Sequence, residues 1–366
     1  MPSRESSTPT SESGEDKLIG IELLRFASAV AVLVFHYQHF AFFGTSQINF
    51  NPVDQPFYAA LRLFYNYGFY GVQVFWCISG FIFFWKYGAA ISRHQITGYK
   101  FFILRISRLY PLHFATLLFV AALQPLYFLR NGAYYIYPNN DLYHFILQIF
   151  MASNWSLQFG DSFNGPIWSI SIEVLVYFIF FLSLRYISGS TTFVCAVALS
   201  AAAVLFLKIS EHPLFTCVMF FYIGCLTAIL YARVRSVPRR RILVTVSALG
   251  AIVVVTGLQF LIPVKPVYFL LFFSPALILL FVMHMPSNAL VSSLLVAAGS
   301  VTYSSYLLHV PIQLTAVTIA TYAHWTVPMY TAWFFLGFLG ITLVLSYCCY
   351  IFFEMPMQSY LRRRFK

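Results

Sequence analysis

Arg25 and His36 lie in one apolar run, residues 18–43, and are eleven residues apart. An α-helix makes about three turns over that distance, so the two side chains share a face. Ionisable groups inside a membrane helix are rare because burying them is costly, and imidazole exchanges a proton near neutral pH. The pair, a titratable imidazole with a cationic group below it, is therefore a candidate functional site. The alternative is a hydrogen-bonding histidine and an arginine that reaches the membrane interface.

Two further arginines, Arg105 and Arg108, are three residues apart and are neighbours on one helix face. Paired guanidinium groups suit a multiply charged phosphate ligand, because each can make bidentate contacts. The alternative interpretation is a pair of anchors for lipid headgroups at the cytoplasmic end of a span.

Several weaker polar features interrupt the other apolar runs. Ser79-Gly80 places small residues in one run, where they allow either close helix packing or passage of a ligand chain. Glu173 lies about two turns inside another helix and needs a partner there, so pairing is favoured over acid–base chemistry. His309 is in a helix that we expect to be interrupted at Pro311, and it lines a polar cavity or bonds a carbonyl freed by the proline.

The elements that position these residues are predicted to be membrane helices. The chain has 366 residues, of which 60% are hydrophobic, 20% aromatic and only 9% charged, unlike a soluble domain. We predict an all-α polytopic membrane protein, since the apolar runs are long enough to cross a bilayer as helices. The ten predicted spans are 18–43, 69–87, 101–124, 166–186, 190–208, 214–232, 242–262, 267–285, 293–319 and 329–354.

Lysines and arginines between the spans set the predicted orientation. With the N-terminus inside, the cytoplasmic segments hold Lys86, Arg93, Lys100, Arg185, Arg233, Arg235, Arg239, Arg240, Arg241, Arg362, Arg363, Arg364 and Lys366. The opposite side holds Arg62, Arg130, Lys208 and Lys265. Both termini are thus expected in the cytoplasm, and the net charge of +11 is explained by topology and anionic lipid without nucleic acid.

The two ends of the chain are polar. Residues 1–17 read as a disordered cytoplasmic tail and residues 358–366 as a basic cytoplasmic tail. Six cysteines form no CxxC pair, so we expect neither a disulfide framework nor a metal site.

Five motifs in a fixed order resemble the acyltransferase 3 family of membrane O-acyltransferases, over nearly the whole chain after the tail. They are Arg25-x10-His36, Ser79-Gly80-Phe81, Arg105-x-x-Arg108, Trp168-Ser169-Ile-Ser-Ile-Glu173 and the segment from Tyr303 to His309. The resemblance assigns residues 18–357 to the family's transmembrane domain. One departure is that many members read EEQFY where this chain has Glu173-Val-Leu-Val-Tyr177, with a single acidic residue.

The resemblance implies transfer of an acyl group, most often acetyl, from cytoplasmic acyl-CoA to a hydroxyl of a carbohydrate such as exopolysaccharide, O-antigen or a lipid-linked sugar. It points to the stand-alone bacterial form without an SGNH domain, in the inner membrane. His36 would then be the general base, Arg25, three turns below it, would orient the donor or stabilise negative charge on the thioester oxygen, and Glu22 would hold the guanidinium of Arg25. Acyl-CoA would be held by Arg105, Arg108, Ser79 and Gly80, with supporting polar roles for Trp168, Ser169, Glu173, Tyr303 and His309.

Two other classes stay open at this point. A transporter or flippase for a lipid-linked sugar or acyl donor would also need many spans and intramembrane charges, although no internal repeat is visible. A non-catalytic scaffold would leave the shared face of Arg25 and His36 without a purpose. Oligomeric state and the choice between direct transfer and a covalent relay are not indicated by the sequence.

Overall fold

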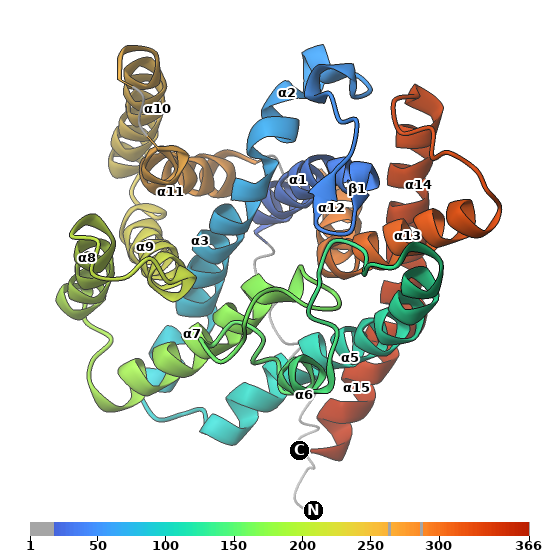
Figure 1. Cartoon of the computed structure of the whole chain (residues 1–366). Helices are drawn as coiled ribbons and strands as arrows, with labels where there is room; N and C mark the ends of the chain where they lie inside the picture. Colours follow the sequence, from blue (N-terminus) through green and yellow to red (C-terminus); the bar gives the residue numbers. More distant parts are fainter. Residues whose placement is uncertain (1–17, 263–264, 286–287, 366) are drawn as a thin grey trace, which may run out of the picture.

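The computed structural model describes residues 18–262, 265–285 and 288–365, so the predicted tail 1–17 lies outside the described residues. The chain forms a helical bundle with one very short hairpin (Figure 1). The helices on the ten predicted spans are α1 (Ile19–His36), α3 (Gly71–Phe83), α5 (Gly98–Asn131), α7 (Ile167–Tyr186), α8 (Thr191–Phe206), α9 (Pro213–Val234), α10 (Pro238–Leu261), α11 (Pro266–His284), α13 (Thr302–Tyr322) and α14 (Ala332–Cys349).

Shorter elements connect or extend these helices. They are η1 (Tyr37–Ala41), β1 (Phe42–Phe43), β2 (Ser46–Gln47), η2 (Pro52–Asp54), α2 (Tyr58–Tyr67), η3 (Gly68–Tyr70), η4 (Phe84–Gly88), α4 (Ala89–Ser92), α6 (Leu142–Ile149), α12 (Ala289–Ser300), η5 (Tyr350–Glu354) and α15 (Met355–Arg364). The strands β1 and β2 pair antiparallel.

The all-α polytopic class is confirmed, but the number of full-length spans is smaller than ten. Within the described ranges, eight helical runs are long and apolar enough to cross a membrane, and the bent pair α12–α13 makes a ninth. The remaining predicted span is α8, whose 16 residues reach only about 24 Å against a hydrocarbon core of about 30 Å. Every predicted span nevertheless coincides with a helix.

The start of α1 and the end of the last span lie at the same end of the bundle. Arg25, in the second turn of α1, is within electrostatic range of Glu354 at the end of η5. Residues 358–364 of the predicted basic tail are helical, because they belong to α15, which follows η5 and ends at Arg364.

The expected interruption of the helix at Pro311 is wrong. The bend, of 45°, is between α12 and α13 at residue 301, and α13 continues through Pro311. Proline has no N–H, so the carbonyl of Leu307 loses its helical partner. The side-chain amide of Asn164, fully buried before α7, donates to that carbonyl at 3.0 Å and to Thr116 Oγ1 at 3.1 Å. A neighbouring segment therefore satisfies the backbone that the proline frees.

The helices α3 and α9 pack with their backbones almost in contact. A Cβ at Gly80 would lie 1.8 Å from the carbonyl oxygen of Phe221, and one at Gly224 would lie 2.0 Å from the carbonyl oxygen of Cys77. Small residues at facing positions permit this approach. The assignment of Gly80 to acyl-CoA binding is therefore corrected: the structure explains this glycine by helix packing.

Replacing Gly80 by alanine is expected to lower the melting temperature of the purified protein by several degrees. The added methyl group overlaps backbone that cannot rotate away, and overpacking costs about 1–3 kcal/mol. Gly250→Ala is the matched control, because nothing lies within 4 Å of a Cβ at that position on α10. A Gly80→Ala protein that melts with the wild type would show that α3 and α9 are not packed this closely.

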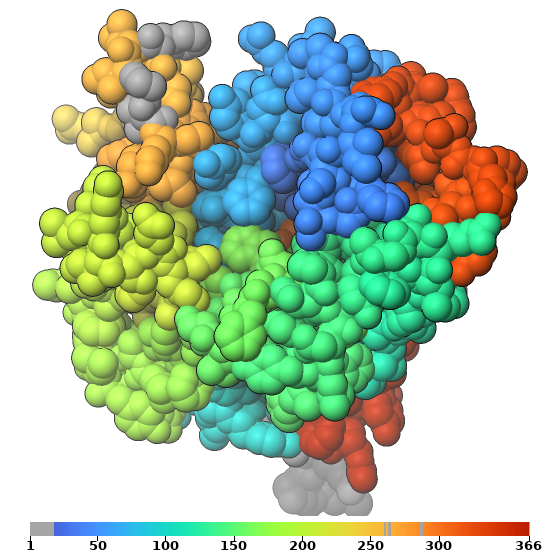
Figure 2. Space-filling model, in the orientation of Figure 1, coloured from blue at the N-terminus to red at the C-terminus, as the bar shows by residue number. Residues whose placement is uncertain are grey.

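The segment between α5 and α7 covers the end of α1. In Figure 2 this green segment crosses the middle of the visible face, next to the blue segment that holds the hairpin. Tyr135 Oη donates to the carbonyl of His39 at 2.9 Å, and Gln124 exchanges two hydrogen bonds with the backbone of Tyr135. At the start of α6 the backbone N–H of His144 donates to Asp141, and this holds the pKa of that carboxyl below its usual range.

Candidate active site

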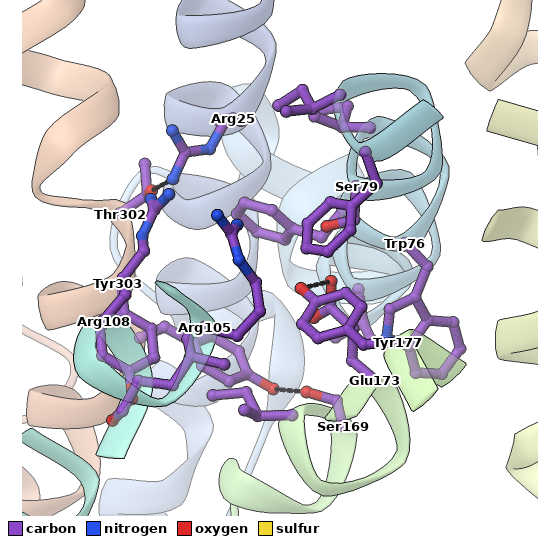
Figure 3. Close-up of a pocket in the computed structure, with 18 residues that line it drawn as sticks. Arg25, Trp76, Ser79, Arg105, Arg108, Ser169, Glu173, Tyr177, Thr302 and Tyr303 are labelled. Atoms are coloured by element: carbon purple, nitrogen blue, oxygen red, sulfur yellow. Dashed lines mark hydrogen bonds between the residues drawn. The ribbon is translucent and has the colours of Figure 1, made fainter. Parts of the chain in front are cut away.

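A cavity of about 130 Å³ lies among α1, α3, α5, α7 and the start of α13. Its polar lining is rich in groups that the sequence singled out (Figure 3). The polar side chains that line it are Arg25, Ser79, Arg105, Arg108, Ser169, Glu173, Tyr177, Thr302, Tyr303 and Tyr306. Arg25, Arg105 and Arg108 are far apart in sequence but converge here, with their guanidinium groups on one side of the cavity (Figure 3).

Arg25 is held in place by two neighbours. Its Nη1 donates to Glu22 Oε2 at 2.9 Å and its Nη2 to Thr302 Oγ1 at 3.0 Å. Gly299 on α12 packs so closely against Glu22 that a Cβ there would lie 1.8 Å from the carboxylate. The structure thus places Glu22 as the residue that orients Arg25, and α12 and α13 complete the arrangement.

Arg105 and Arg108 still have unused hydrogen-bond donors. Arg105 Nη2 donates to Tyr87 Oη at 2.6 Å, and its guanidinium lies 4.8 Å from the centre of the Phe83 ring. The Nε of Arg105 is buried without a partner. Arg108 makes no hydrogen bond or ion pair with any residue that the structure describes. These donors can bind an anion that enters the cavity.

The opposite side of the cavity carries Glu173 (Figure 3). Tyr177 Oη donates to Glu173 Oε1 at 2.6 Å, one helical turn along α7, and Ser79 lies beside the same carboxylate. The Tyr177 ring stacks on Phe83 at 4.2 Å. The carboxylate is therefore tied to its own helix and does not form an ion pair with an arginine of the described chain.

The other predicted supporting residues form the walls and their links. Ser169 Oγ and Tyr306 Oη are 2.8 Å apart. Tyr303 Oη donates to the carbonyl of Leu109, which fastens α13 to α5. Trp168 stacks on Phe69 with ring centroids 5.7 Å apart and lies just outside the lining of the cavity.

His36 belongs to a separate cluster of imidazoles. Its ring stacks on His309, with centroids 4.9 Å apart and planes at 25°, and lies 4.7 Å from His39. Gln313 Nε2 donates to the carbonyl of His36 at 2.8 Å. The Nδ1 of His36 and the Nε2 of His309 are buried without hydrogen-bond partners.

The shared helix face of Arg25 and His36 does not bring both side chains into one cavity. Arg25 lines the cavity and His36 does not. Eleven residues put them on one face, but also about 16 Å apart along the helix axis. Tyr306 joins the two regions, because it lines the cavity and its ring centroid is 6.0 Å from that of His309.

His309 does not bond the carbonyl freed by Pro311, since Asn164 takes that carbonyl. Its Nδ1 lies 3.3 Å from the carbonyl oxygen of Ser305. A proton on Nδ1 would fit this contact and leave Nε2 as an acceptor. His309 is therefore a buried ring that stacks on the predicted base.

Sequence reasoning missed several residues of the site. Tyr177 is four residues after Glu173 and Tyr306 three residues before His309, which are helical spacings that could have indicated both. Thr302 gave no signal because its partner, Arg25, is 277 residues away in the sequence. Tyr87, the partner of Arg105, gave none because it is one of many aromatic residues in an apolar run.

A family model described as an acyltransferase domain matches residues 18–351. The chain belongs to the acyltransferase 3 family. Its spans and this membership make it a multi-pass membrane acyltransferase. No curated protein and no solved structure matches the chain. The family match ends within η5, before α15 begins.

Proposed function

We propose that this acyltransferase moves an acyl group, most often acetyl, from cytoplasmic acyl-CoA to a hydroxyl of a cell-surface or lipid-linked carbohydrate. The observation that carries the proposal is the convergence of Arg25, Arg105 and Arg108 on one cavity, with Arg108 unpaired among the described residues. A guanidinium without a partner inside a membrane protein is costly, so the site is suited to an anionic ligand. Acyl-CoA is the common acyl donor that carries phosphates.

Arg25, Arg105 and Arg108 have different proposed roles. Arg105 and Arg108 lie in the first turns of α5, at the end that the distribution of basic residues assigns to the cytoplasm, and would bind the phosphates. Arg25, fixed by Glu22 and Thr302 in the same cavity, would orient the donor.

His36 would take the proton of the sugar hydroxyl. The new C–O bond forms as the C–S bond breaks, and the proton passes from the imidazole to the CoA thiolate, giving free CoA thiol and the ester. His36 lies about 16 Å along α1 from Arg25. The donor must therefore extend past Tyr306, whose hydroxyl contacts Ser169 and whose ring adjoins His309.

The carbohydrate would enter from the end of the bundle opposite to Arg105 and Arg108. That end holds the histidine cluster beneath the segment between α5 and α7. With the cytoplasmic assignment of the arginine end, the acceptor would lie on the outer side of a bacterial inner membrane. Donor and acceptor thus approach His36 from opposite sides.

Purified protein supplied with acetyl-CoA and acceptor glycan tests the proposal. We expect free CoA thiol to appear in step with a glycan mass increase of one acetyl group. Release that depends on the acceptor supports direct transfer. Movement of intact glycan or intact donor across a proteoliposome membrane, without thiol release, would instead identify a transporter or flippase.

A further inference from the structure

The helix α15 places another arginine against α5, the helix that carries Arg105 and Arg108. Arg362 Nε donates to Ser107 Oγ at 3.3 Å, and α15 packs along α5. Ser107 is buried and lies between Arg105 and Arg108 in the sequence. Arg362 does not line the cavity itself. It therefore lies against α5 outside the cavity, near the two arginines that face inward.

Arg105, Arg108 and Arg362 form a cluster of like charges. Arg362 is within electrostatic range of both Arg105 and Arg108, and each repels the others. None of the three forms an ion pair within the part of the chain that the structure describes. Glu354 is within range of Arg108, but it accepts a hydrogen bond from Ser304. Gathering unpaired cations in this way favours a ligand with several negative charges.

We propose that Arg362 binds the 3′-phosphate of the ribose of acyl-CoA. The inference rests on the proposed function and adds a specificity residue to it. Acyl-CoA carries a diphosphate next to its pantetheine arm and a separate phosphate on the ribose, farther from the thioester. Arg105 and Arg108 face the cavity and take the inner diphosphate, so Arg362, outside the cavity, takes the outer phosphate.

A phosphate headgroup of an anionic lipid offers the same chemistry to Arg362. The two sources differ in what they do to the choice of donor. A contact with the 3′-phosphate makes the enzyme prefer acetyl-CoA over acetyl-3′-dephospho-CoA. A contact with lipid instead changes kcat/KM for both donors by the same factor, and that change depends on the lipid present.

The test compares Arg362→Ala with the wild type in detergent, using kcat/KM for the two donors measured by thiol release. We expect the variant to lose about tenfold with acetyl-CoA, the effect of one charge-assisted contact, and to match the wild type with acetyl-3′-dephospho-CoA. Arg362→Lys should retain part of the preference. Arg363→Ala is the matched control, because its side chain is exposed on the same helix, and both donors should behave as in the wild type.

The readout is the ratio of kcat/KM for the two donors, measured within one preparation, so a variant that folds less well can still be compared with the wild type. Equal losses with both donors, or no loss with either, would overturn the inference. A loss that appears only with vesicles containing anionic lipid, and equally for both donors, would assign Arg362 to lipid and also overturn it. A wild-type enzyme with the same kcat/KM for acetyl-CoA and acetyl-3′-dephospho-CoA would contradict this inference but not the proposed function. No release by the wild type would overturn both.

Discussion

Replacing His36 by glutamine is expected to lower the rate of acyl transfer by about a hundredfold to ten-thousandfold, the usual contribution of a positioned general base. Glutamine keeps a polar side chain of similar size but does not accept the hydroxyl proton. Donor affinity should stay at the wild-type value, because His36 is separated from the arginine cavity by Tyr306 and His309. Thiol release under saturating acetyl-CoA measures the rate, and titration with CoA measures affinity.

The neighbouring histidine provides the matched control for this experiment. His39 is as buried as His36 and its ring centroid lies 4.7 Å from that of His36, so His39→Gln makes the same chemical change in the same cluster. We expect His39→Gln to retain most of the activity. Near-normal transfer by His36→Gln would remove His36 from the mechanism, and a larger loss in His39→Gln would move the base to that residue.

The helices and the polar residues of the cavity could be predicted because both depend on local sequence. Apolar runs fix the spans, and Arg25, Arg105 and Glu173 stand out as charges within those runs. Their meeting in one cavity depends on how α1, α5 and α7 pack, which periodicity does not give. The order of the family motifs supplied that link.

Other features could not be predicted because their causes lie on remote segments. Pro311 does not break its helix, because Asn164 satisfies the freed carbonyl from more than a hundred residues away. Gly80 is ambiguous until Gly224 is seen at the facing position on α9. The shared face of Arg25 and His36 and their separation of about 16 Å along α1 both follow from helical geometry, but the contact between the two regions is made by the side chain of Tyr306, which comes from another helix.

Replacing Arg108 by alanine is expected to raise the KM for acetyl-CoA by about tenfold to a hundredfold with little change in kcat. Charge-assisted hydrogen bonds contribute about 1.5–3 kcal/mol each, and the guanidinium of Arg108 is free among the described residues to make them. A phosphate contact far from the thioester stabilises the bound substrate and the transition state equally, so the loss of this contact should appear in KM. Steady-state kinetics of thiol release gives both constants.

Two comparisons separate this role from a structural one. Acetyl-pantetheine lacks the phosphates, so Arg108→Ala and the wild type should use it equally well. The melting temperature of Arg108→Ala without donor should stay close to that of the wild type, because the substitution breaks no hydrogen bond among the described residues and removes both repulsion from Arg25 and Arg105 and attraction to Glu173 and Glu354. Added CoA should then stabilise the wild type more than the variant. A variant that falls in kcat with both donors would place Arg108 at the reacting thioester, and the phosphates would need another site.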